Sequence, residues 1–202
     1  MDELDLLKKD WKRQEANIPK FHADEIQEML KKRSSSLVKW IFIVSVIEFA
    51  FWIGLEIFSN FSGYNKIFVE AGVETLANVI IIINYAVILG FIAIFFYNYQ
   101  KIKITDDAKR LMKKILITRK TVKCYVWFNI IYFAISFIIM NYFVLTNTES
   151  LEGINMTVFI GVIFGVMLIF IAILLLFYRL VYGILTRKLY KNYKELKNLE
   201  LE

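Results

Sequence analysis

The sequence predicts an all-α membrane protein with four transmembrane helices, both termini in the cytoplasm, and short amphipathic cytoplasmic helices at the N-terminus and in the middle loop. Hydrophobic residues make up 58% of the 202 residues, against ~45–50% in soluble domains, and the mean hydropathy is +0.53. Charged residues still make up 22% of the chain. They must therefore be concentrated in a few segments, which leaves long apolar runs typical of a polytopic membrane protein.

The region 1–36 is expected to be a cytoplasmic unit of amphipathic helices. It contains eight basic and eight acidic residues and no apolar run that fits the core of a signal peptide. Leu4, Leu7 and Trp11 share one face of a helix that ends before Pro19. These three side chains are the candidate residues for binding a partner.

A second short helix is predicted over residues 23–33, with acidic residues at its start and basic residues at its end. The polar residues 34–36 are expected to join it to the first span. In the middle loop, residues 98–123, Thr105 is the predicted N-cap of a basic amphipathic helix that lies on the membrane surface. The transmembrane spans are predicted at about 37–59, 77–97, 124–145 and 156–178, with the last continuing toward residue 185.

The distribution of basic residues predicts the orientation. Residues 1–39 hold nine Lys or Arg, the middle loop nine, and the segment from Arg179 onward six, whereas the two remaining loops hold only Lys66. The positive-inside rule therefore places both termini and the middle loop in the cytoplasm. The expected organisation is a cytoplasmic unit over 1–36, a membrane domain over 37–185 and a basic cytoplasmic tail over 186–202.

Glu48 is the most unusual residue of the first span. It lies ~13 Å along the helix from Lys39, close to the expected midplane, where a charge costs at least ~2.5–3.5 kcal/mol. Arg179 is its possible cationic partner at a matching depth, and Asn129 lies at a similar level. Four interpretations of Glu48 stay open, namely a proton or ion relay, a ligand site, an interhelical clamp that fixes register, and a carboxyl group kept neutral. Asn84, in the second span, is expected to form an interhelical hydrogen bond.

Two further patterns bear on packing and chemistry. Gly161 and Gly165 form a GxxxG spacing that serves either packing within the chain or association into a homo-oligomer. One Cys and one His leave no cluster for a metal, and no nucleotide or hydrolase motif is present. The sequence therefore predicts neither an enzyme nor a cofactor. The pI near 9.2 is explained by topology, so no nucleic-acid partner is expected.

The N-terminal stretch DELDLLKKDWKRQE, followed by IPKFHADEIQEMLKKRSSSLVKWIFIVSVIEF, resembles an uncharacterised bacterial family of small four-span inner-membrane proteins. Members of such families sometimes carry a name taken from carotene-cleaving monooxygenases. Those enzymes bind iron through several histidines, whereas this chain has only His22. The segment from Leu6 to Trp11 is also similar to the cytosolic heads of some membrane anti-sigma regulators. The resemblance implies location in the inner membrane.

Two function classes remain after these observations. The first is a non-enzymatic regulatory or scaffold protein whose cytoplasmic face binds a protein partner or anionic lipid, since nearly all the mass outside the membrane lies on one side. The second is a small transporter or proton-coupled component that uses Glu48. The sequence favours the first class, because the external loops offer little mass for binding a substrate.

Overall fold

The computed structural model describes residues 8–9, 11, 23–63, 66–70, 72–105, 107–147 and 155–200. Within this part of the chain the regular secondary structure is entirely helical. The helices are α2 (Ala23–Ser62), α3 (Lys66–Glu70), α4 (Glu74–Lys103), α5 (Ala108–Asn147) and α6 (Met156–Leu199). Four of them are long and apolar enough to cross a membrane.

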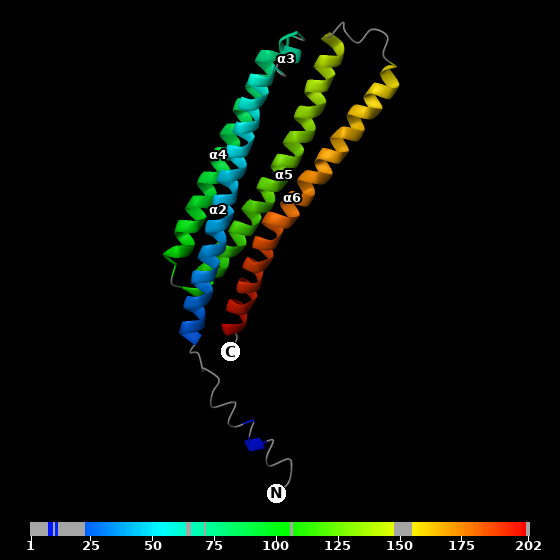
Figure 1. Ribbon diagram of the computed structural model, residues 1–202. Helices are drawn as coiled ribbons and strands as arrows, with labels where there is room; N and C mark the ends of the chain where they lie inside the picture. The colour runs from blue at the N-terminus through cyan, green and yellow to red at the C-terminus, as the bar shows by residue number, and fades with distance from the viewer. Residues whose placement is uncertain are drawn as a thin grey trace.

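The four long helices form an antiparallel bundle (Figure 1). Each packs against the next in the order α2, α4, α5, α6, and α6 packs back against α2, so the ring of helices is closed. The short α3 packs against α4 and α5. We call the end of the bundle where α2 begins and α6 ends the basic end, and the opposite end the α3 end.

The long helices exceed the predicted spans. α2 and α5 have 40 residues each and α6 has 44, whereas ~20 residues cross a bilayer. The excess lies mostly at the basic end, where α2, α5 and α6 continue as one bundle. α6 runs without a break to Leu199, through the predicted last span and into the predicted basic tail.

One hydrophobic core lies in the middle of the bundle and includes Ile41, Ile88, Phe95, Tyr125 and Tyr178. A second hydrophobic core holds the extension at the basic end together. Its buried members come from all four long helices: Leu30, Val38, Ile102, Leu111, Ile115, Leu189 and Leu196. Buried Ser34 accepts a hydrogen bond of 3.0 Å from Asn192 in α6. The predictions of a separate helix over 23–33 and a polar join over 34–36 were therefore wrong, because packing against α6 keeps these residues helical within α2.

The predicted surface helix of the middle loop was also wrong. Residues 108–123 form the first turns of α5, which continues without a break into the third span. Leu111 and Ile115 are fully buried in the second core rather than facing lipid. An amphipathic helix can bury its apolar face against any apolar neighbour, and here the neighbours are other helices.

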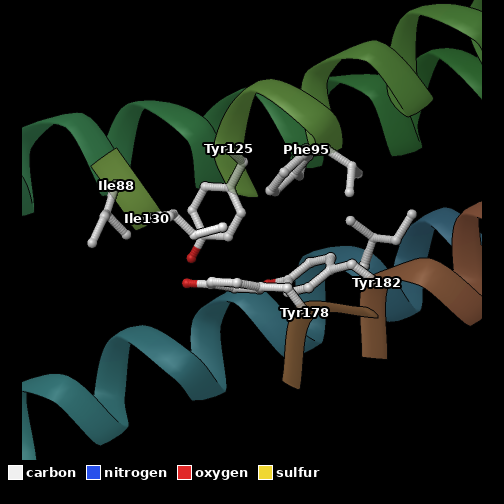
Figure 2. Packing of buried hydrophobic residues seen from close by; sticks show 8 residues of the cluster. Ile88, Phe95, Tyr125, Ile130, Tyr178 and Tyr182 are labelled. Carbon is white, nitrogen blue, oxygen red and sulfur yellow. The ribbon is translucent and has the colours of Figure 1, made fainter. Parts of the chain in front are cut away.

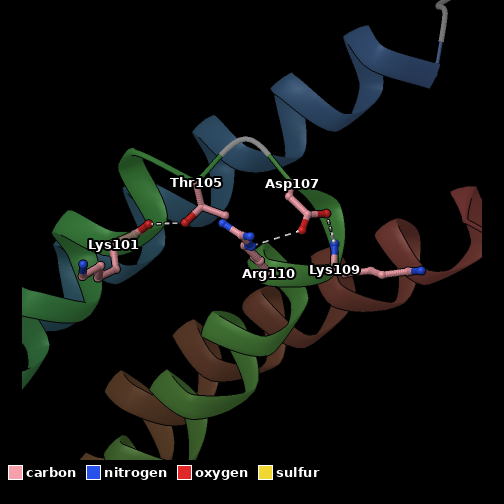
Figure 3. A network of polar contacts seen from close by, with 5 residues as sticks. All are labelled: Lys101, Thr105, Asp107, Lys109 and Arg110. Carbon is pink, nitrogen blue, oxygen red and sulfur yellow. Dashed lines mark hydrogen bonds and ion pairs between the residues drawn. The ribbon is translucent and has the colours of Figure 1, made fainter.

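Thr105 is not the N-cap of α5, as the turn between α4 and α5 shows (Figure 3). The Thr105 hydroxyl donates a hydrogen bond of 2.5 Å to the Lys101 carbonyl, so it closes the end of α4. Asp107 instead starts α5, because its Oδ1 accepts from the Lys109 amide at 3.1 Å and its Oδ2 lies 3.5 Å from the Arg110 Nε. An aspartate at this position satisfies free amides of the first turn.

The connection between α2 and α4 contains α3, which the sequence did not predict. Gly63 and Gly72 flank α3 with φ angles of 74° and 67°. This left-handed region is accessible to glycine at low cost, whereas a side chain is strained there. The two glycines therefore let the chain turn sharply at both ends of α3.

The buried position of Ile115 leads to a stability prediction. Ile115→Ala should lower the free energy of unfolding by about 2–5 kcal/mol, because it leaves a cavity in the second core. Ile117, two residues further along α5 and 38% exposed, supplies the matched control, and Ile117→Ala should have a much smaller effect. Thermal unfolding of the purified variants in detergent measures both. Equal effects would contradict the packing of residues 108–123 into the bundle.

Candidate functional site

The most polar site inside the bundle joins the first and last long helices. Glu48 of α2 is only 7% exposed. Its Oε1 accepts a hydrogen bond of 2.5 Å from the Tyr178 hydroxyl, and its Oε2 accepts one of 2.9 Å from the Tyr182 hydroxyl. The two tyrosines are four residues apart on α6, so they lie on the same helix face. Each carboxylate oxygen thus has one phenolic donor.

A third tyrosine completes the site from α5. Tyr125 is fully buried, and its ring lies 6.3 Å from that of Tyr178 and 5.6 Å from that of Tyr182, between centroids. Figure 2 shows its hydroxyl pointing toward the two α6 tyrosines. That hydroxyl has no hydrogen-bond partner within the described residues. Phe95 of α4 packs edge-on against Tyr125 at 5.6 Å, so all four helices contribute.

The two hydrogen bonds explain how the carboxyl group is tolerated. A charged side chain in the middle of a membrane helix costs about 2.5–3.5 kcal/mol on insertion scales. A hydrogen bond to a charged group contributes about 1.5–3 kcal/mol. Two such bonds therefore offset part of this cost without a counter-ion. We call Glu48, Tyr125, Tyr178 and Tyr182 the tyrosine–glutamate cluster.

The structure brings Arg179 to the predicted depth but not to Glu48. Arg179 follows Tyr178 directly on α6, but its side chain is exposed, and within the described residues no ion pair joins it to Glu48. Successive residues of a helix point ~100° apart, so Tyr178 occupies the inner face and Arg179 the outer one. Asn129 is buried, yet its side-chain amide donates to the Tyr125 carbonyl at 2.8 Å rather than to Glu48.

The members of the cluster occupy different positions within their own apolar runs. On α2, Glu48 is near the middle of the apolar run 37–59. On α5 and α6, however, Tyr125 and Tyr178 fall at the basic-end limits of the spans 124–145 and 156–178. The apolar runs of α5 and α6 are therefore offset from that of α2 along the bundle by about ten residues, or ~15 Å.

Asn84 lines a cavity of about 500 Å³ at the α3 end. Its side-chain oxygen is buried without a hydrogen-bond partner in the described part of the chain, so the predicted interhelical bond is not formed through that atom. In the same cavity Tyr85 donates a hydrogen bond to Glu56. Trp52 lines the cavity too, and it lies one helical turn from both Glu48 and Glu56. The cavity thus approaches the cluster from the α3 end.

A second cavity, of about 580 Å³, lies between α5 and α6 toward the basic end. Tyr178 and Tyr182 form part of its wall, together with Lys123 and Arg179. We call it the α5–α6 groove. Two tyrosines of the cluster thus line the α5–α6 groove, and Trp52 of the α3-end cavity lies one helical turn from Glu48.

The remaining candidate residues lie outside this site. A Cβ atom added at Gly161 or Gly165 would meet nothing within 4 Å, so the alternative of close packing within the chain was wrong for this pair. Trp11 is 72% exposed, while Leu4 and Leu7 lie outside the described residues. Among the residues that the structure describes, no group of three or more His, Cys, Asp or Glu is placed so that it could hold a metal ion.

Sequence reasoning missed the three tyrosines of the cluster. Tyr125, Tyr178 and Tyr182 fall near predicted span ends, where aromatic residues commonly form an interfacial belt. The structure buries all three. The i, i+4 spacing of Tyr178 and Tyr182 places two hydroxyl donors on one helix face, and this was the signal in the sequence that could have paired them with Glu48.

The hydrogen bond between Tyr178 and Glu48 yields the second prediction. Tyr178→Phe should lower the free energy of unfolding by about 1.5–3 kcal/mol, because it removes a donor to a charged group. The same change in a Glu48→Gln background should cost less, giving a coupling energy of about 0.5–3 kcal/mol in a double-mutant cycle. Thermal unfolding in detergent supplies the values. Exposed Tyr142 provides the control Tyr142→Phe. If Arg179→Gln proved costly and Tyr178→Phe neutral, the assigned partners would be wrong.

Comparison with known proteins places this chain in a family. A family model described as "Domain of unknown function (DUF8845)" matches residues 24–201. The match begins at Asp24, so the stretch DELDLLKKDWKRQE lies before it, whereas most of the second stretch of the resemblance lies within it. No curated protein and no solved structure matches the chain. Because the match covers α2 through α6, the chain belongs to the family of the domain of unknown function DUF8845.

Proposed function

We propose that this protein is a non-enzymatic regulatory or scaffold protein of the bacterial inner membrane, with both termini in the cytoplasm. The observation that carries the proposal is the extension of α2, α5 and α6 beyond the length of a span, held together by its own core. A rigid helical extension on one side of a membrane is suited to holding a partner. The excess of Lys and Arg at this end supports the cytoplasmic orientation.

The N-terminal segment is the proposed binding element for a cytoplasmic protein. Trp11 exposes 72% of its surface, and exposed aromatic residues are over-represented among the residues that dominate binding energy. The segment is joined to α2, which begins at the basic end.

A photo-crosslinking experiment tests this proposal. With a photoreactive amino acid in place of Trp11, irradiation of cells should give a discrete adduct of higher mass, because a bound partner lies within reach. The matched control places the same amino acid at Phe61, which is 88% exposed at the α3 end and should give no such adduct. Adducts at both positions or at neither would refute a cytoplasmic partner at the N-terminus.

A second candidate function is proton or ion transfer through Glu48. It is favoured by the tyrosine–glutamate cluster, because two of its tyrosines line the α5–α6 groove and its Glu48 lies one helical turn from Trp52 of the α3-end cavity. Hydroxyl and carboxyl groups in contact can pass a proton along hydrogen bonds, and carboxylates inside membrane bundles often mark such routes.

Reconstitution into liposomes tests the second candidate. If Glu48 carries protons, the full-length protein should dissipate an imposed pH gradient, and Glu48→Gln should slow this at least ~tenfold, as expected for the loss of a proton carrier. Exposed Glu70 of α3 supplies the matched control, since Glu70→Gln should leave the rate unchanged. A rate equal in wild type and Glu48→Gln, or no dissipation by either protein, would exclude this function.

A further inference from the structure

We propose that the α5–α6 groove binds one anionic phospholipid from the membrane leaflet at the basic end. This inference rests on the proposed placement of the long helices in a membrane. The groove has a volume of about 580 Å³ and is lined by residues of α5 and α6 alone. It is therefore open to the lipid on the outside of the bundle rather than to the other two helices.

The charges of the groove select for an anion. Its walls carry Arg119, Lys120, Lys123 and Arg179, and no Asp or Glu lines it. Within the described residues, none of these four bases has a carboxylate at ion-pair distance. Arg119 stacks over the Tyr190 ring at 4.1 Å, and its buried Nε has no hydrogen-bond partner in that part of the chain. Four uncompensated cations fit a phosphate group.

The shape of the groove selects for a lipid. Toward the α3 end its walls become apolar, with Val126, Ile130 and Leu175, which matches the glycerol ester region and the first part of an acyl chain. Trp127, an exposed residue of the same wall, lies one turn beyond Lys123, where tryptophan marks the boundary between headgroups and hydrocarbon. The groove thus changes from basic to apolar in the direction in which a phospholipid changes from phosphate to hydrocarbon.

Gly183 keeps the groove open near the bases. A Cβ atom added there would meet only atoms of its own helix, at 3.8 and 3.9 Å. A larger side chain is therefore compatible with the fold and would project into the groove. The variant Gly183→Leu narrows the groove near the bases without removing a charge.

Quenching of Trp127 by brominated lipid tests the inference. The full-length protein is placed in phosphatidylcholine nanodiscs that contain a small fraction of brominated phosphatidylglycerol or, in parallel, of brominated phosphatidylcholine. The signal of Trp127 is the difference between wild type and Trp127→Phe. We expect several-fold stronger quenching by the anionic lipid. Each base removed should weaken this preference roughly fivefold, as expected for a base near an anionic surface.

Three variants separate charge, shape and general attraction. Lys123→Gln combined with Arg179→Gln should abolish the preference, and Gly183→Leu should abolish it with all charges kept. Lys109→Gln combined with Lys113→Gln removes two exposed bases of α5 outside the groove and should leave the preference unchanged.

The remaining outcomes each overturn the inference in a distinguishable way. Equal quenching by the two lipids would exclude selection for an anionic headgroup. Recovery of the fluorescence on adding glycerol phosphate would show that the groove binds a soluble phosphate compound instead. If the Lys109 and Lys113 variant had the same effect as the Lys123 and Arg179 variant, the preference would reflect non-specific electrostatic attraction between α5 and anionic lipid. Absence of quenching of any tryptophan by either lipid would refute the membrane placement itself, and with it the proposed function.

Discussion

The hydrogen bonds from Tyr178 and Tyr182 to Glu48 determine how this bundle closes. They join α2, the first long helix, to α6, the last, and these two helices have no short loop to hold them together. Because the donors are neutral, a carboxyl group is held inside the bundle without a cation and without burying a second charge. Tyr125 and Phe95 pack around the same point from the other two helices, so all four long helices meet at one acidic side chain.

Hydropathy predicted the four spans of this chain but not the ends of its helices. A window of apolar residues reports where a bilayer fits, and it carries no information on helices that continue into water. Ser34 and Leu111 illustrate the limit, because both looked like parts of separate segments. Their helical state depends on contacts with residues of α6 such as Asn192 and Leu189, which are more than 70 positions away in the sequence.

The candidate site was only partly predictable, because position along a helix follows from the sequence and side-chain direction depends on packing. A carboxylate in an apolar run is rare, so Glu48 was recognisable from the sequence alone. Arg179 does lie level with Glu48, as counting residues along the helices predicted, because it follows Tyr178 directly. The direction of its side chain was not predicted, because the rotation of α6 about its own axis depends on packing. Tyr178 and Tyr182 take the inward face, and no property of either residue alone reveals that.

The unbroken course of α6 has a mechanical consequence. Tyr178 and Asn192 lie on one continuous helix, one in each hydrophobic core, separated by 14 positions, or ~21 Å of axial rise. A regular helix transmits torsion along its axis, whereas a hinge between separate helices would absorb it. The contacts of Tyr178 with Glu48 and of Asn192 with Ser34 therefore fix the rotation of a single rigid helix against α2 at two heights.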